Sequence, residues 1–197
     1  MAKHAKICGP SSAHRWMTCP GSERLSQGMP DSSSKYAEEG SLAHKLGEAC
    51  LLSGLDPLDY VGLELADETA AIAEEMAAAV KVYTDYVKDL SGGDCEPGNG
   101  VWKLFGHNLS AVELPIDLGW LIPGGKGTTD FVLYRLDTGD LHVVDYKHGA
   151  GVAVDPEWNP QLLLYAAGVV HDLRERGHTG FSGKVFLHIV QPRAGRR

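Results

Sequence analysis

Two acidic residues and a lysine in the second half of this 197-residue chain form a pattern that can do chemistry. Asp130 opens one apolar run, and Asp145 and Lys147 close the next one. Between the two runs lies Asp137-Thr138-Gly139-Asp140, which is typical of a β-hairpin turn. With the loop centred on Thr138-Gly139, the pattern predicts an antiparallel pair in which Asp130 lies opposite Lys147.

The alternation of side chains along a strand predicts that this trio shares one face of a sheet. Asp145 and Lys147 are two residues apart, and directly opposed residues of neighbouring strands also share a face. Converging carboxylates and an ammonium group can hold a metal ion and stabilise an anion, although a solvated strand face gives the same pattern. Val143 and Val144 favour the metal site, because consecutive apolar residues indicate a strand buried on both sides.

A helix is predicted after the lysine strand. Asn159 suits the N-cap, Pro160 suits the first helical position and Gly177 is a plausible stop. Gln161 and Tyr165 are four residues apart and therefore lie on one helical face. The two side chains would face the sheet, or they would simply be polar residues on the surface of the helix.

Further candidates lie upstream of the trio. His44 and Glu48 are spaced i, i+4 on a predicted helix, so both can point towards the same face of the sheet. A single helical histidine is more often an ordinary polar residue than a ligand. Glu113, in a predicted strand from Ala111 to Asp117, is either a ligand of a second metal or an edge charge.

These elements together resemble the RecB-like branch of the PD-(D/E)XK nuclease superfamily. Asp130 followed by Asp145-Tyr146-Lys147 resembles its Asp…(Asp/Glu)-x-Lys signature, and Gln161 with Tyr165 resembles the Gln-x-x-x-Tyr motif that comes next. Glu39-Gly40-Ser41-Leu42-Ala43-His44 resembles the Gly-x-x-x-His element of the first core helix. The opening segment from Ser11 to Ser22 resembles that of phage-encoded members of the branch.

The resemblance implies an α/β (α+β) fold with a restriction-endonuclease-like core. The core order is α-β-β-β-α-β, with a central mixed sheet flanked by helices and a last strand from Lys184 to Val190. The chain is expected to form one domain, residues 1–197. Its parts would be a helical lead-in over 1–35, a helical part over 36–110 and the sheet core over 111–191. The 3.6-residue apolar spacing also predicts an amphipathic helix over 64–90.

The resemblance also implies a metal-dependent reaction. His44, Asp130 and Asp145, with the carbonyl of Tyr146, would hold Mg²⁺ or Mn²⁺, because oxygen-rich sites favour these ions. Glu48 would ligate the metal or orient His44.

The remaining motif residues would act on the substrate. Lys147 would position or deprotonate the attacking water and stabilise the transition state. Gln161 and Tyr165 would hold either the DNA backbone or the Lys147 strand. The implied activity is hydrolysis of DNA phosphodiester bonds, as by an exonuclease in phage recombination or DNA processing.

Composition narrows the remaining possibilities. No apolar run is long enough to cross a membrane and no signal peptide opens the chain, so a cytoplasmic protein is expected, in a bacterial host if it is phage-encoded. The net charge is −8, and residues 51–141 hold 16 acidic and 5 basic residues. Binding to DNA is therefore expected to be weak and sensitive to salt. An iron–sulfur cluster is not expected, because no cysteine follows Cys95.

Two other functions compete with a nuclease. One is a non-catalytic DNA-binding or assembly module on a nuclease fold, or a truncated inactive nuclease. The other is a zinc hydrolase, which the absence of a His-x-x-x-His pattern disfavours. A recombination partner protein and an oligomer are compatible with every one of these hypotheses.

Overall fold

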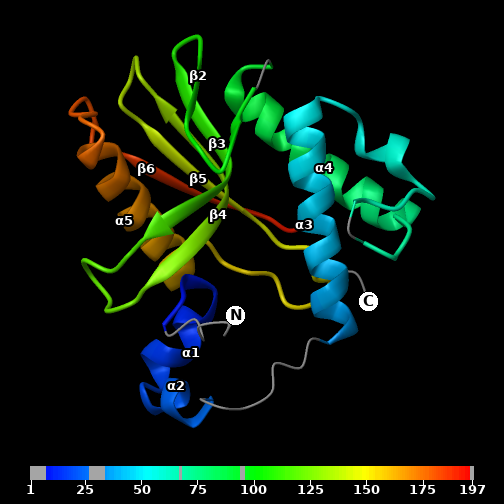
Figure 1. The fold of residues 1–197 in the computed structure, drawn as a ribbon, viewed down its shortest axis with the longest axis horizontal. Coiled ribbons are helices and arrows are strands. Elements are labelled where there is room, and N and C mark those ends of the chain that lie inside the picture. The colour runs from blue at the N-terminus through cyan, green and yellow to red at the C-terminus, as the bar shows by residue number, and fades with distance from the viewer. Residues whose placement is uncertain (1–7, 27–33, 67, 94–95, 196–197) are drawn as a thin grey trace.

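The fold is a mixed α/β architecture in which helices cover both faces of an open sheet (Figure 1). The structure is a computed structural model and describes residues 8–26, 34–66, 68–93 and 96–195. Two parts of the predicted lead-in, residues 1–7 and 27–33, lie outside the described residues. The helical elements are η1 (Pro10–Ser12), α1 (Ala13–Thr18), α2 (Gly21–Ser26), α3 (Lys35–Ser53), η2 (Pro57–Tyr60), α4 (Glu74–Ser91) and α5 (Pro160–Glu175). The strands are β1 (Gly98–Asn99), β2 (Lys103–Phe105), β3 (Asn108–Asp117), β4 (Lys126–Arg135), β5 (Leu141–Tyr146) and β6 (Val185–Val190).

The sheet is mixed, as the sequence predicts. Its strand order is β1-β3-β4-β5-β6, with β2 also paired to β3. The β3–β4 and β4–β5 pairs are antiparallel, whereas α5 carries the chain over to β6, which lies parallel to β5. Along the chain, α3, β3, β4, β5, α5 and β6 follow the predicted order α-β-β-β-α-β. A mixed α/β fold around a central mixed sheet is therefore confirmed.

Each face of the sheet has its own apolar core. Helices α3 and α4 cover one face, where Phe131, Val144 and Tyr146 are buried against them. Helix α5 covers the other face, above Val132 and Val143. Alternate residues of β4 and β5 thus enter opposite cores, and Val143 and Val144 are both fully buried. This burial on both sides agrees with the apolar run in the sequence.

The register of the β4–β5 hairpin differs from the prediction. Val132 pairs with Val143 and not with Asp145, a shift of two residues. The turn is a longer loop in which the Gly139 N–H donates to the Arg135 carbonyl and the Arg135 N–H donates to the Asp140 carbonyl. Gly139, at φ 71°, supplies the left-handed conformation that closes this loop. Because the shift is an even number, every side chain keeps its predicted face.

Two element boundaries also differ from the predictions. Helix α4 begins at Glu74 and not near residue 64, because the chain before it forms two β-bridges, Val61–Ile72 and Glu64–Ala71. The sheet begins at β1, so residues 98–105 belong to the sheet and not to a helical part. In contrast, α5 starts as predicted, with Asn159 as its N-cap.

Within the described residues, no helix is both long enough and apolar enough to cross a membrane.

Candidate functional site

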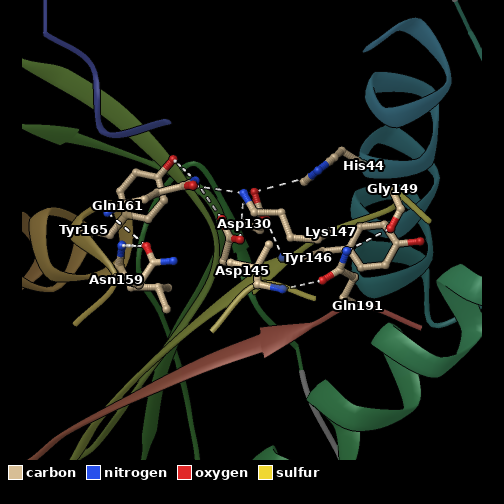
Figure 2. Close-up of polar contacts among 12 residues, drawn as sticks. His44, Asp130, Asp145, Tyr146, Lys147, Gly149, Asn159, Gln161, Tyr165 and Gln191 are labelled. Carbon is tan, nitrogen blue, oxygen red and sulfur yellow. Dashed lines mark hydrogen bonds and ion pairs between the residues drawn. The ribbon is translucent and has the colours of Figure 1, made fainter. Parts of the chain in front are cut away.

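The candidate site lies where α3 and α5 approach the central strands from opposite sides (Figure 2). Asp130 of β4 is its centre. One carboxylate oxygen, Oδ2, accepts a hydrogen bond from the Tyr146 N–H of β5 at 2.7 Å. The other, Oδ1, lies 3.3 Å from Nδ1 of His44, which α3 carries into the site. Asp130 is thereby held between the sheet and α3.

Glu113 of β3 joins this cluster through an unusual backbone conformation. Its φ is 50°, which is rare for a residue with a Cβ atom. The β3–β4 ladder pairs Val112 with Phe131 and Leu114 with Thr129, but leaves out the position between them, where Glu113 faces Asp130. The strand pairing is interrupted there, and one ligand atom from each of His44, Glu113 and Asp130 lies within 4.8 Å of the others. Such a set of one nitrogen and two oxygen donors suits a divalent cation.

Asp145 lies beside this cluster in a more enclosed position. Its side chain is almost fully buried, and Oδ1 accepts a hydrogen bond from Nε2 of Gln161 at 2.9 Å. Oδ2 lies 2.9 Å from Nζ of Lys147. Within the described residues, Oδ2 accepts no hydrogen bond of good geometry, so this buried oxygen is left with the charge of Lys147 as its partner.

Gln161 of α5 holds the acid–lysine pair in place. Its Oε1 accepts a hydrogen bond from Lys147 Nζ at 3.0 Å, while its Nε2 donates to Asp145 and lies 3.2 Å from the hydroxyl of Tyr165. The cap residue Asn159 fixes this first turn by accepting hydrogen bonds from the N–H groups of Gln161 and Leu162 at 3.0 and 3.2 Å. The predicted helical face therefore points into the site, and Gln161 contacts the strand residues directly (Figure 2).

The carboxylates of the site are partly buried and close together, and their burial and mutual repulsion shift several pKa values. Burial, reinforced by the charge of Asp130, raises the pKa of Glu113 to about 7. Burial and Asp130 likewise raise the pKa of Asp145 to about 6, although Lys147 opposes the shift. Burial disfavours a charged His44, yet the hydrogen bond and charge of Asp130 outweigh it, so the pKa of His44 is raised. A nearby cation would stabilise the ionised forms of Glu113 and Asp145, and the raised pKa of His44 reflects the same excess of negative charge.

A polar network behind the site ties α3 to the end of the sheet. The Tyr146 hydroxyl lies 2.8 Å from Nδ1 of the buried His148, whose Nε2 lies 3.1 Å from Oε1 of Glu39 on α3. Arg193 donates to the same glutamate oxygen at 2.7 Å. The Tyr146 ring also packs edge-on against His44, with centroids 5.4 Å apart. This network links α3, the helix that carries His44, to the end of the sheet.

The structure brings most of the predicted site residues together. His44, Asp130, Asp145, Lys147, Gln161 and Tyr165 all meet at the site, and Tyr146 contributes its backbone N–H and its ring. Glu113 lies inside the cluster. Glu48 contributes negative charge that raises the pKa of Glu113, but within the described residues it makes no hydrogen bond to His44.

Three residues that support the site are absent from the sequence-based predictions. They are His148, Arg193 and Gln191, the last of which holds the loop after β5 by donating to the carbonyl oxygens of Gly149 and Val152 at 2.9 and 3.3 Å. The sequence carries one signal for His148, which directly follows the Asp-x-Lys triplet. Arg193 and Gln191 act through contacts that only the folded chain creates.

Comparison with known proteins identifies the family of the chain. No solved structure matches the chain. A family model described as "Protein of unknown function (DUF2800)" matches residues 4–196, which is nearly the whole sequence. The chain therefore belongs to the DUF2800 family.

Proposed function

We propose that this protein is a Mg²⁺- or Mn²⁺-dependent nuclease that hydrolyses DNA phosphodiester bonds on a RecB-like version of the PD-(D/E)XK core. The observation that carries the proposal is the juxtaposition of two groups. His44, Glu113 and Asp130 offer ligand atoms within 4.8 Å of one another. Directly beside them, Asp145 holds Lys147 with its ammonium group 2.9 Å away. The order of the strands and helices around the site supports the same assignment.

The residues present fit a hard divalent cation. The donors are carboxylates and an imidazole, and within the described residues a buried oxygen of Asp145 lacks a hydrogen bond. The raised pKa values of Glu113 and Asp145 reflect negative charge that a cation would offset. His44, Glu113 and Asp130 would hold the ion, and the resemblance implies Asp145 and the Tyr146 carbonyl as further ligands. A bound cation would polarise the phosphate and lower the pKa of a water molecule.

The protein's own residues would orient and stabilise the reacting groups. Lys147 is partly exposed, so its ammonium group can meet a phosphate while Asp145 and Gln161 fix its direction. The lysine would stabilise the additional negative charge that develops on the phosphate as water attacks. Its backbone N–H donates to the Val190 carbonyl at 2.9 Å, so β6 also restrains it. Gln161 and Tyr165 would act by holding this strand beside the scissile bond.

The test compares cleavage of linear and covalently closed circular DNA in Mg²⁺ or Mn²⁺. Lys147→Ala is expected to lower the rate by about 10²–10³-fold, as for other lost transition-state contacts. Lys184→Ala is the matched control, because Lys184 is exposed and precedes β6 at the opposite end of the sheet. Digestion of linear DNA alone would support the exonuclease role implied by the resemblance.

Two results would contradict the proposal. Full activity in Lys147→Ala would exclude this site. Absence of cleavage by the unaltered protein in both metals would favour the non-catalytic DNA-binding module, with or without a recombination partner.

A further inference from the structure

The segment between β5 and α5 carries an exposed aromatic residue, Trp158, three positions before Gln161 of the candidate site. Trp158 is 81% exposed and directly precedes Asn159, the cap of the helix that carries Gln161. Within the described residues, its indole makes no hydrogen bond and no ring contact. An exposed tryptophan with no packing role is unusual, because aromatic side chains normally bury most of their surface.

The backbone at Trp158 is strained without an evident structural benefit. The Asn159 N–H donates to the Pro156 carbonyl at 3.3 Å, which closes a turn with Trp158 at its third position. Its φ is 53°, a conformation that glycine or asparagine usually supplies in such turns. A bulky residue there costs free energy, and strain of this kind concentrates at functional positions.

The segment that carries Trp158 is well braced. Asp155 accepts a hydrogen bond from the Glu157 N–H at 2.9 Å, and its carbonyl accepts one from Asn159 Nδ2 at 3.1 Å. Earlier in the same loop, the Val154 N–H donates to the Gln191 side chain at 2.9 Å, and Gln191 donates to the Val152 carbonyl at 3.3 Å. The backbone that carries the indole is therefore braced before any ligand arrives, which lowers the entropy cost of binding one.

We propose that Trp158 is the stacking platform for a nucleobase of single-stranded DNA whose backbone enters the candidate site. This inference rests on the proposed function, and it defines the substrate more narrowly. An aromatic face can stack on any base, so the contact would not depend on sequence. Asp155 and Glu157, near neighbours of Trp158 in the sequence, carry exposed carboxylates that repel phosphate, so a base and not the backbone of the strand is expected at Trp158.

The choice of a single strand follows from the geometry of DNA. Inside a duplex each base is already stacked on its neighbours, and its faces are closed to a side chain. A base face becomes free in a single strand, or at an end that has opened. The enzyme is therefore expected to prefer single-stranded or opened ends to the interior of a duplex.

The experiment measures binding of a short, fluorescein-labelled oligothymidylate by fluorescence anisotropy. Lys147→Ala serves as the background, so that the strand is not cut, and a duplex closed by a hairpin at both ends is the comparison ligand. Trp158→Gly is expected to weaken oligothymidylate binding roughly tenfold, whereas Trp158→Phe keeps most of it. Binding of the closed duplex is expected to change little. Trp120→Ala is the matched control, because Trp120 is also exposed but stacks on His171, with ring centroids 4.7 Å apart.

Thermal unfolding of the same variants separates recognition from a structural role. Glycine relieves the left-handed backbone, so Trp158→Gly is expected to unfold at the same temperature as the parent or higher. A lower unfolding temperature together with weaker binding would indicate a structural residue and overturn the inference. Unchanged oligothymidylate binding in Trp158→Gly would overturn it as well.

Calorimetry with Mn²⁺ alone keeps this inference distinct from the proposed nuclease activity. Trp158→Gly is expected to bind the metal like the parent, since Trp158 contributes no ligand atom. If the protein cuts no DNA but Trp158→Gly loses oligothymidylate binding, the nuclease proposal fails and the stacking site stands. If cleavage is present and binding is indifferent to Trp158, the stacking site fails and the nuclease proposal stands.

Discussion

Glu113 has two features that destabilise the folded state, one in its backbone and one in its carboxylate. Its backbone is left-handed, and its carboxylate is partly buried opposite that of Asp130. Neither feature strengthens the sheet, because the ladder between β3 and β4 is interrupted at this point. Local strain and unfavourable charge are typical of positions that bind something.

The pKa of Glu113 predicts how its replacement changes stability with pH. The folded protein raises this pKa from 4.5 to about 7, so the folded state binds the proton more tightly than the unfolded state. Ionisation of Glu113 therefore lowers the free energy of unfolding as pH rises through this range. Glu113→Gln in metal-free buffer is expected to be more stable than the parent by about 1–3 kcal/mol at pH 8. Most of this gain is expected to disappear at pH 5, as measured by urea denaturation at both values.

The control for this effect is Glu157→Gln, which alters an exposed carboxylate and is expected to change stability little at either pH. A gain for Glu113→Gln that is equal at pH 5 and pH 8 would mean that packing, and not ionisation, is responsible.

The same substitution tests whether Glu113 is a metal ligand. An amide oxygen binds a hard cation more weakly than a carboxylate, so Glu113→Gln is expected to reduce Mn²⁺ affinity by about 10–100-fold or more. Calorimetric titration of the parent, Glu113→Gln and Glu48→Gln measures this. Equal Mn²⁺ affinities for the parent and Glu113→Gln would mean that Glu113 is not a ligand and that the carboxylates of β4 and β5 bind the metal without it.

At the scale of elements, the site depends on how α3 is held against the sheet. His148, which is 4% exposed, links the Tyr146 hydroxyl to Glu39 and so connects the end of β5 to α3. His44 lies on the same helix and packs against the ring of Tyr146. A change at His148 is therefore expected to reach the metal site without touching a ligand.

His148→Ala is expected to lower the free energy of unfolding by about 1–3 kcal/mol, because the buried Tyr146 hydroxyl loses its partner. The substitution is also expected to weaken Mn²⁺ binding, because α3 would no longer be held where His44 lies beside Asp130. Urea denaturation and calorimetry measure the two effects. His107→Ala, which alters an exposed histidine, serves as the control. Lost stability with unchanged metal affinity would show that the network does not position His44.

Features set by local patterns could be predicted from the sequence, and features set by long-range contacts could not. Alternation along β5 placed Asp145 and Lys147 on one face, and the Asn159-Pro160 cap placed Gln161 at the start of α5. The hairpin register was predicted wrongly because turn residues alone do not fix the length of the loop. The left-handed Glu113 and the contacts of Arg193 have no local signature, because tertiary packing imposes both.

At the scale of the whole molecule, the candidate site joins the two layers on either side of the sheet. His44 comes from the α3–α4 layer, whereas Gln161 and Tyr165 come from the α5 layer (Figure 1). A cation bound to Glu113 and Asp130 on the sheet and to His44 on α3 would therefore crosslink folded elements, and the unfolded chain cannot bind it in this way.

Metal binding is consequently expected to stabilise the whole protein. With Mn²⁺ at about 100 times its dissociation constant, the free energy of unfolding is expected to rise by about 2.7 kcal/mol. Asp130→Asn is expected to lose most of this increase, because it removes a charged ligand from the centre of the cluster. Thermal unfolding with and without Mn²⁺ measures the difference. An equal rise in both proteins would mean that the metal binds elsewhere.

The contact between Glu39 and Arg193 has a consequence for the time at which the site is assembled. The two residues are 154 positions apart, and strand β6, which restrains Lys147, is also made late in synthesis. A ribosome that has translated the Asp-x-Lys strand and the Gln161 helix still holds a chain whose α3 is not clamped. On the proposed function, metal binding and cleavage of DNA are therefore expected only once residue 193 has left the ribosome and can pair with Glu39.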